Sequence, residues 1–358
     1  MRTGTAHLPL HYGAAPRWLF ERMTLLAREI VRCLVEEAGA EEVLRKLSDP
    51  FWFQAFGSVL GFDWHSSGLT TTACGALKEG LRGLERDTGL FVAGGKGKTS
   101  RKTPTEISEH CDRAGLDGDP LIYASRLSAK VDNNAVQDGY QIYHHAFFFT
   151  GSGHWAVVQQ GMNDATGYAR RYHWLSDSLT SFVDEPHAAI CAQKMSRDVL
   201  NLVAHESEQA RQTVTALSHE KPDALVGEMR KIQNLELPRR HEVLASDVRP
   251  DSLARILLKT YERQPEDFER LLGMEGVGAK TLRALSLIAE LIYGVKTSMR
   301  DPARFSYAHG GKDGHPYPVD REIYDRSIET LRRAVERAKI GDRERLAALK
   351  RLAANPAP

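Results

Sequence analysis

Two glycines on either side of one apolar residue, Gly276-Val277-Gly278, are followed closely by Lys280 and Thr281. Glycine lets a chain turn sharply and lets its backbone come close to a ligand. Apolar residues then repeat at helical spacing, so the turn opens the positive end of a helix, where backbone amides attract anions. The pattern predicts two helices joined by a hairpin that holds an anion such as a phosphate. The predicted contacts are Gly276, Gly278, Lys280 and Thr281; a tight corner between packed helices is the plainer alternative.

Acidic and histidine side chains in the N-terminal half could bind a divalent cation. Asp63 and His65 stand two positions apart at the entrance of an expected helix, which brings a carboxylate and an imidazole near one point. A turn held by Asp63, with a serine capping the next helix, is the plainer alternative. Further candidates before and along two expected strands are Asp132, Asp138, His144, His145, Gln159 and Gln160.

Strand alternation decides which of these candidates can share a site. It places Tyr143 and His145 on one face of the sheet and His144 on the other, and it separates Gln159 from Gln160 in the same way. Acids before one strand and a polar pair late in the next resemble a metal-dependent nuclease core, in which carboxylates around Mg²⁺ or Mn²⁺ activate water. Glutamines stand where such a core has an acid and a lysine. We expect the ion to bind to Asp63, His65 and Asp138, with Asp132 and one of the two histidines beside it.

Two basic segments are candidates for contacts to a DNA backbone. Lysines and arginines alternate with glycines in a loop after a short expected strand, and Ala169 to Trp174 mixes cations with aromatic rings that suit stacking. An ordinary charged surface is the plainer alternative for both. The candidate contacts are Lys96, Lys98, Arg101 and Lys102 in the loop, and Arg170 and Arg171 in the second segment.

The same loop imitates an ATP-binding phosphate loop at Gly97-Lys98-Thr99. That motif needs a glycine where this chain has Val92, and Pro104 is expected to break the helix that must follow. The sequence therefore argues against ATP binding.

The order of the expected elements predicts an α+β fold. Helices are expected over residues 18–35, 41–47, 69–84, 251–293 and 323–338, and strands over 90–93, 141–149 and 154–160. Gly294 is expected to cap the end of the fourth helical region, and an aromatic cluster in the core is expected from Phe51, Trp52, Phe53 and Phe56. We expect a mixed helix and β-hairpin catalytic domain over residues 1–195 and a helical connector over 196–230. An all-α helix-hairpin-helix DNA-binding domain over 231–345 and a flexible tail over 346–358 complete the predicted organisation.

Composition limits the class of protein. The 358 residues are 42% apolar and 27% charged, which is ordinary for a globular protein of two or three domains. The net charge is only +1, so a nucleic acid must be held by local basic patches. The four cysteines form no Cys-x-x-Cys pair, and no apolar run predicts a signal segment or a membrane span. We expect a cytoplasmic protein with no membrane partner, and the oligomeric state stays open.

The hairpin resembles the helix-hairpin-helix of DNA-repair enzymes. Other strings resemble a family of archaeal and bacterial proteins known only as a domain of unknown function, with this motif near the C-terminus. They occupy residues 18–23, 49–54, 61–68, 129–139, 155–163 and 276–294. In related glycosylases, the lysine after the hairpin can be a Schiff-base nucleophile and a Val-Asp downstream supplies an essential aspartate. Lys280 and Asp320 match those positions here, although 40 residues separate them (320 − 280).

These observations predict a DNA-binding repair protein, with a structure-selective nuclease that uses Mg²⁺ or Mn²⁺ as the leading hypothesis. Its partner would be single-stranded or structured DNA. A base-excision glycosylase and lyase that uses Lys280 and Asp320 is the second hypothesis. A DNA-binding factor without catalysis is the third.

Overall fold

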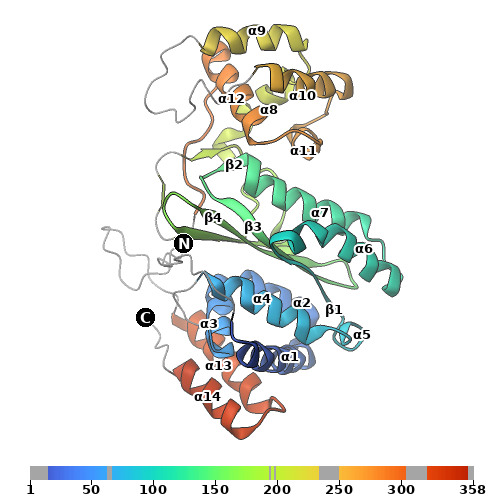
Figure 1. The fold of residues 1–358 in the computed structure, drawn as a ribbon, viewed down its shortest axis with the longest axis vertical. Coiled ribbons are helices and arrows are strands. Elements are labelled where there is room, and N and C mark those ends of the chain that lie inside the picture. Colours follow the sequence, from blue (N-terminus) through green and yellow to red (C-terminus); the bar gives the residue numbers. More distant parts are fainter. Residues whose placement is uncertain are drawn as a thin grey trace.

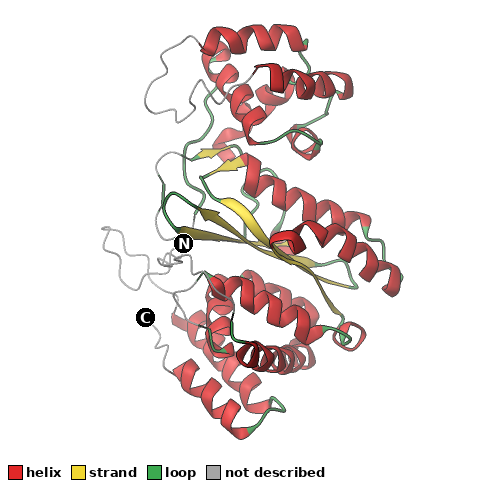
Figure 2. Ribbon diagram, viewed as in Figure 1, coloured by secondary structure: helices red, strands yellow, loops and turns green. Residues whose placement is uncertain are grey.

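The computed structural model describes residues 15–62, 67–192, 195–196, 199–233, 250–303 and 321–353. These form the predicted α+β fold, arranged in layers around one antiparallel sheet (Figure 1). One helical group lies against one face of the sheet, two helices cover the other face, and a second helical group lies beyond them (Figure 2).

The first helical group comes from both ends of the chain. It contains α1 (Arg17–Ala38), α2 (Ala40–Ser48), α3 (Pro50–Leu60) and α4 (Gly68–Leu81). Asp49 ends α2 and begins α3, because its Oδ1 accepts from Phe51 N over 2.8 Å and from Trp52 N over 3.1 Å. The predicted aromatic cluster is buried here, at Trp52, Phe53 and Phe56. Two C-terminal helices complete the group: α13 (Arg321–Arg337) and α14 (Asp342–Ala353).

The sheet has five strands in the order β1-β3-β4-β5-β6, and all neighbours are antiparallel. The side covered by α6 and α7 is called the α7 face below, and the side covered by α2 and α4 is called the α4 face. Phe147 and Phe149 belong to the core on the α7 face, whereas Ala146 and Phe148 belong to the other core. The strands are β1 (Leu90–Lys96), β3 (Gln141–Thr150), β4 (Trp155–Asn163), β5 (Tyr168–Leu175) and β6 (Ala189–Cys191).

The helices on the α7 face were not predicted. After β1 the chain forms the 3₁₀ turn η1 (Gly97–Lys102), then α6 (Thr103–Ala114) and α7 (Asp119–Lys130). Pro104 was expected to break a helix but lies in the first turn of α6, where a missing amide hydrogen removes no helical hydrogen bond. The end of α7 widens into a π-helical segment, η2 (Val131–Ala135), which leads into β2 (Val136–Gln137). Strand β2 pairs with β7 (Leu200–Asn201).

The second helical group contains the hairpin. Helix α11 (Phe268–Gly273) is capped by Asp267, and α12 (Ala279–Tyr293) ends at Gly294 in the left-handed conformation that the sequence predicted. Their companions are α8 (Glu208–Leu217), α9 (Pro222–Gln233) and α10 (Pro250–Arg263). Short elements elsewhere are α5 (Glu85–Thr88), η3 (Ser176–Ser178) and η4 (His205–Ser207).

The helical groups divide the chain differently from the predicted domains. Helix α8 was expected in a connector but packs on α11 and α12. Helix α13 was assigned to the DNA-binding domain but packs on α1 and α3 of the first group. Residues from 346 onward were expected to be a flexible tail, yet α14 reaches Ala353 and buries Ala348 and Leu352. Burial of an apolar face, which local sequence does not locate, decides these assignments.

In the described part of the chain, no helix combines the length and apolarity needed to cross a membrane. All four cysteines are buried and free.

Candidate active site

Four buried polar side chains form a line on the α7 face of the sheet. Ser125 Oγ in α7 lies 2.9 Å from His145 Nε2 in β3, and His145 Nδ1 lies 2.8 Å from Gln159 Oε1 in β4. Gln159 Nε2 then lies 2.6 Å from Asp132 Oδ2 in η2. We call Ser125, His145, Gln159 and Asp132 the relay. No pair of its neighbouring members is close in sequence, so the fold alone assembles it.

The hydrogens of the relay can be assigned from its anchor. Trp174 Nε1, which can only donate, also contacts Asp132 Oδ2 over 3.0 Å, so this oxygen is an acceptor. Gln159 must then present its amide nitrogen to Asp132 and its oxygen to His145. His145 Nδ1 consequently carries a hydrogen, and its Nε2 is left to accept from the hydroxyl of Ser125.

His145 is uncharged in this setting. Burial lowers the pKa of His145 to about 4, opposed by the hydrogen bond to Gln159, so the ring is neutral at neutral pH. A neutral imidazole with a free Nε2 can accept the proton of the serine that it contacts. The relay therefore places a serine hydroxyl in hydrogen-bond contact with an uncharged imidazole.

Asp132 is fixed on both of its oxygens. His187 Nε2 lies 2.5 Å from Asp132 Oδ1, while Gln159 and Trp174 share Oδ2. The π-helical turn η2 carries the carboxylate, and such turns in helices recur at functional sites. Asp132 thus orients the relay, and each of its two oxygens already has a protein partner.

A cavity of about 720 Å³ opens at the serine end of the relay. Ser125 and His145 both line it, and the surrounding walls come from η1, α6, α7, η2, β3 and the end of α11. Three of the lining residues are basic, namely Arg101, Arg126 and Lys130, and one is acidic, Asp119. Arg101 and Arg126 are exposed and make no ion pair with another residue in the described ranges. The cavity is therefore suited to an anionic ligand.

The hairpin is fastened beside this cavity. Lys130 Nζ donates to Leu272 O over 2.8 Å and to Met274 O over 2.5 Å, and burial lowers the pKa of this lysine. Asn134 Oδ1 accepts from Ala279 N over 3.2 Å, at the start of α12. The helix that supplies Ser125 therefore also holds the hairpin in position.

The hairpin itself matches the sequence prediction in part. Gly276 has φ +90°, which glycine tolerates, and Gly276 and Lys280 are exposed. Gly278 is the N-terminal cap residue of α12. Thr281 is 1% exposed, so its predicted contact with DNA is wrong for the side chain. Exposure of Lys280 also contradicts the desolvated lysine that a Schiff-base mechanism requires, and Asp320 lies outside the described residues.

The predicted split of polar pairs between the two faces is confirmed. His144 and Gln160 lie on the α4 face, opposite His145 and Gln159. Tyr143 was expected beside His145, but a register shift between Ile142 and His144 turns it, and its hydroxyl contacts Gln160 Nε2. Both ring nitrogens of His144 lack a partner in the described ranges, and burial lowers its pKa to about 3.

Arg170 and Arg171 are buried, so the prediction that they form a DNA-binding surface is wrong. Their segment is β5, whose alternation sends one arginine to each face. Arg170 Nη1 contacts Asp138 Oδ2 over 2.9 Å, and its two terminal nitrogens bind Asp301 at 2.9 and 2.7 Å. Charges buried in this way need partners, and these partners lie far away in sequence.

The predicted metal ligands do not meet in the described residues. Asp63 and His65 lie outside those residues. Asp138 is buried and accepts hydrogen bonds from Arg170, Tyr172 and the amide of Tyr140. Burial raises the pKa of Asp138, and the charge of Arg170 opposes that effect. Within the described ranges, no three histidine, cysteine or acidic residues are placed to hold a metal ion.

The basic loop is exposed as predicted. Lys96 ends β1, and Lys98, Arg101 and Lys102 follow in η1 with exposed side chains. Because Arg101 also lines the cavity, this loop forms a basic border beside Ser125.

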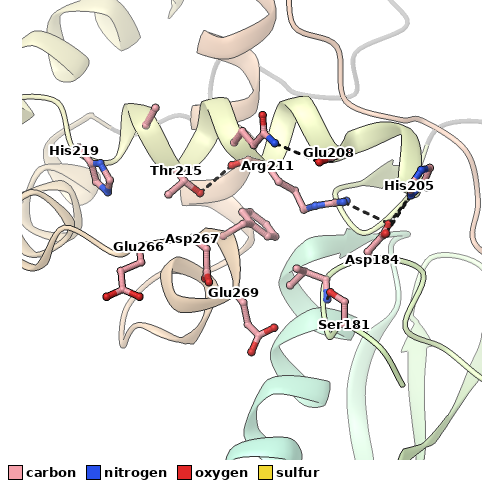
Figure 3. Close-up of a pocket in the computed structure, with 14 residues that line it drawn as sticks. Ser181, Asp184, His205, Glu208, Arg211, Thr215, His219, Glu266, Asp267 and Glu269 are labelled. Carbon is pink, nitrogen blue, oxygen red and sulfur yellow. Dashed lines mark hydrogen bonds and ion pairs between the residues drawn. The ribbon is translucent and has the colours of Figure 1, made fainter. Parts of the chain in front are cut away.

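A second cavity, of about 680 Å³, lies between α8 and the start of α11. Figure 3 shows Arg211 of α8 directed toward Asp184, with His205 beside Asp184 and with Glu266 and Asp267 on the segment that leads into α11. Asp184 pairs with His205 over 3.1 Å and with Arg211 over 3.4 Å. Five of the lining residues are acidic and one is an arginine, so the lining carries net negative charge and does not favour an anionic ligand.

The chain belongs to the DUF763 family of proteins of unknown function, whose family model matches residues 4–319. No curated protein and no solved structure matches the chain. The function of the protein is therefore inferred from the geometry of the site.

Proposed function

We propose that the protein binds DNA and cleaves its phosphodiester backbone, as a repair nuclease, in the cavity next to Ser125. A single observation carries the proposal: one cavity with a basic border, beside the helix-hairpin-helix, has a serine hydrogen-bonded to a neutral histidine in its wall. Its volume of about 720 Å³ lies within the range of pockets that bind small ligands, and a nucleotide unit is such a ligand.

Two surfaces beside the cavity support DNA as the ligand. The η1 loop offers Lys96, Lys98, Arg101 and Lys102 for contacts with a phosphate backbone. The hairpin offers the exposed backbone of Gly276 and the charge of Lys280. Strands held by these two surfaces would pass over the cavity between them.

A requirement for Mg²⁺ or Mn²⁺ is a separate part of the proposal. It depends on Asp63 and His65, because the oxygens of Asp132 and Asp138 are already engaged by protein donors. The metal-independent route through Ser125 needs none of these ligands.

The test is a cleavage assay on labelled single-stranded, duplex and branched DNA, with Mg²⁺, with Mn²⁺ and with EDTA. Cleavage that survives EDTA supports the serine route, and cleavage abolished by EDTA supports the metal route. Charge reversal by Arg101→Glu with Arg126→Glu should weaken cleavage strongly, and Lys350→Glu on the remote α14 is the matched control. Trapping of damaged DNA by borohydride through Lys280, without cleavage of undamaged DNA, would favour the glycosylase and lyase instead.

DNA binding without cleavage under any of these conditions would leave only the non-catalytic factor. Absence of binding would contradict all three.

A further inference from the structure

We infer that Ser125 is the nucleophile of the cleavage reaction and forms a transient covalent bond to a DNA phosphate, with His145 as its base and Gln159 and Asp132 as positioning residues. The inference rests on the proposed function, because it names the chemistry of the same cavity.

The hydroxyl of Ser125 is directed differently from those of Ser128 and Thr215, two other buried hydroxyls in helices. Ser128 Oγ, one turn later in α7, donates to Ser125 O, and Thr215 Oγ1 donates to Arg211 O in α8. Such bonds to the preceding turn are the usual solution for a hydroxyl inside a helix. Ser125 instead points across to β3 and contacts His145 Nε2 over 2.9 Å.

The relay gives the serine a base of fixed orientation. His145 donates through Nδ1 to Gln159 and accepts through Nε2 from Ser125, as the anchoring at Asp132 requires. This is the logic of a nucleophile, a base and an orienting carboxylate, with one glutamine amide inserted between base and acid. The amide passes no proton; its oxygen holds the Nδ1 hydrogen and stabilises the ring when it becomes charged.

The reaction balances with DNA and water alone. Ser125 Oγ attacks phosphorus while its proton moves to His145 Nε2, so an Oγ–P bond forms and the bond from phosphorus to one deoxyribose oxygen breaks. The leaving oxygen takes the proton back from His145. Water then attacks phosphorus, gives a proton to Nε2 and displaces Ser125, which recovers its hydrogen.

The basic lining selects a phosphodiester over a neutral ester. Arg101 and Arg126, both exposed, line the same cavity as Ser125, against one acid, Asp119. Their charges would stabilise the negative charge that builds on phosphate oxygens in the transition state.

The test compares wild-type protein with Ser125→Ala and with Ser128→Ala, a matched control on the same helix. We expect Ser125→Ala to lower DNA cleavage by about 10⁴-fold or more while DNA affinity stays within threefold, because only the nucleophile is lost. Acid quenching of a labelled-DNA reaction should trap an SDS-resistant protein–DNA adduct at Ser125. Ser128→Ala should keep both cleavage and adduct.

A fluorophosphonate probe separates the two proposals, because it reports an activated serine whether or not DNA is cleaved. Labelling of Ser125 without any DNA cleavage would overturn the nuclease proposal and would keep the assignment of Ser125 as a nucleophile. Full cleavage by Ser125→Ala would overturn the nucleophile and retain the nuclease. Loss of cleavage in Ser125→Ala with neither adduct nor labelling would assign Ser125 a positioning role and also overturn the nucleophile. Neither cleavage nor labelling in the wild type would overturn both.

Discussion

The two faces of the central sheet bury similar polar side chains in different settings. On the α7 face, Ser125, His145, Gln159 and Asp132 form a line whose serine end meets a cavity. On the α4 face, Arg171 Nε donates to His173 Nε2 and its Nη1 donates to Gln54 Oε1, under the cover of α2, α3 and α4. Buried polar groups that end at a cavity can act on a ligand, whereas enclosed groups fasten elements together.

The α4-face group shows what the enclosed setting does. His173 Nε2 accepts from Arg171, so its Nδ1 carries the hydrogen that Leu47 O accepts over 2.9 Å. Burial keeps the pKa of His173 well below its usual value, with the charge of Arg171 acting in the same direction. The arginine also lies 4.8 Å from the ring centre of Phe53. The contacts join β5 to α2, α3 and α4.

The largest difference in DNA cleavage between the two faces is expected when the two neighbouring histidines of β3 are replaced one at a time. His145→Ala should lower cleavage by roughly 10³-fold with DNA affinity retained, because it removes the base that contacts Ser125. His144→Ala, one residue away on the α4 face, should lower cleavage less than fivefold, since His144 contacts no relay member. The measurement is single-turnover cleavage of labelled DNA. Equal losses in both variants would remove the functional distinction between the faces.

The next largest effect is expected in stability, on the other face. Arg171→Met should lower the free energy of unfolding by about 3 kcal/mol, because it removes the hydrogen bonds to His173 Nε2 and Gln54 Oε1 and leaves the buried His173 Nε2 without its donor. Ser125→Ala should lower it less, by about 1 to 2 kcal/mol, since it removes one hydrogen bond and leaves only His145 Nε2, in the cavity wall, without its donor. Urea unfolding followed by circular dichroism measures both. A larger loss of stability in Ser125→Ala than in Arg171→Met would show that the relay mainly stabilises the fold.

The free energy of unfolding should depend on pH, because β3 buries one histidine on each face of the sheet. The folded-state pKa is about 3 for His144 and about 4 for His145, against 6.5 for the ordinary group. Below pH 6.5 the unfolded chain binds protons that the folded chain does not, so stability should fall from pH 6.5 down to about 4. Each buried histidine contributes a slope of up to about 1.4 kcal/mol per pH unit.

His144→Leu provides the check on that slope. It should remove one histidine's share of the pH dependence and leave stability at pH 7 equal or higher, because two unpartnered nitrogens leave the core. Urea unfolding at pH 5 and at pH 7 tests this. An unchanged slope would show that His144 binds protons equally well in the folded and in the unfolded chain.

The smallest expected effect concerns the hairpin. Lys280→Gln should weaken DNA binding a few-fold and reduce the salt slope of log Kd by about one, as loss of a single phosphate contact does. Lys350→Gln on α14 should change neither quantity. Fluorescence anisotropy across a salt series measures both. An unchanged salt slope in Lys280→Gln would remove the hairpin lysine from the DNA surface.

Local sequence patterns predicted part of the fold well. The helical spacing over residues 18–35 and 282–292, the glycine at 294, and the split of His144 from His145 all follow from the period of a helix or strand. Strand β5 was missed because arginines and a histidine in its sequence imitate a charged surface. The tertiary structure buries these side chains through partners such as Asp301, which no local window contains.

The candidate site shows the same limit. Asp132, His145 and Gln159 were predicted to be functional, and the structure joins them, while Asp138 and Gln160 belong to other contacts. Ser125 was not predicted, because a serine in an amphipathic helix carries no signal of its own. Only the packing of α7 on β3 brings the buried serine of the helix to the histidine of the strand.

Local sequence patterns fixed the α+β class, the two helices joined by a glycine turn, and the opposite faces of the two histidines in β3 and of the two glutamines in β4, because these depend on backbone period and on glycine at particular turns. The tertiary structure decided which helix covers which face, that α13 and α14 join the N-terminal helices, and that Ser125 meets His145. The physical reason is distance along the chain. His187 and Asp132 lie 55 positions apart, and only the packing of whole elements brings such groups to hydrogen-bond range.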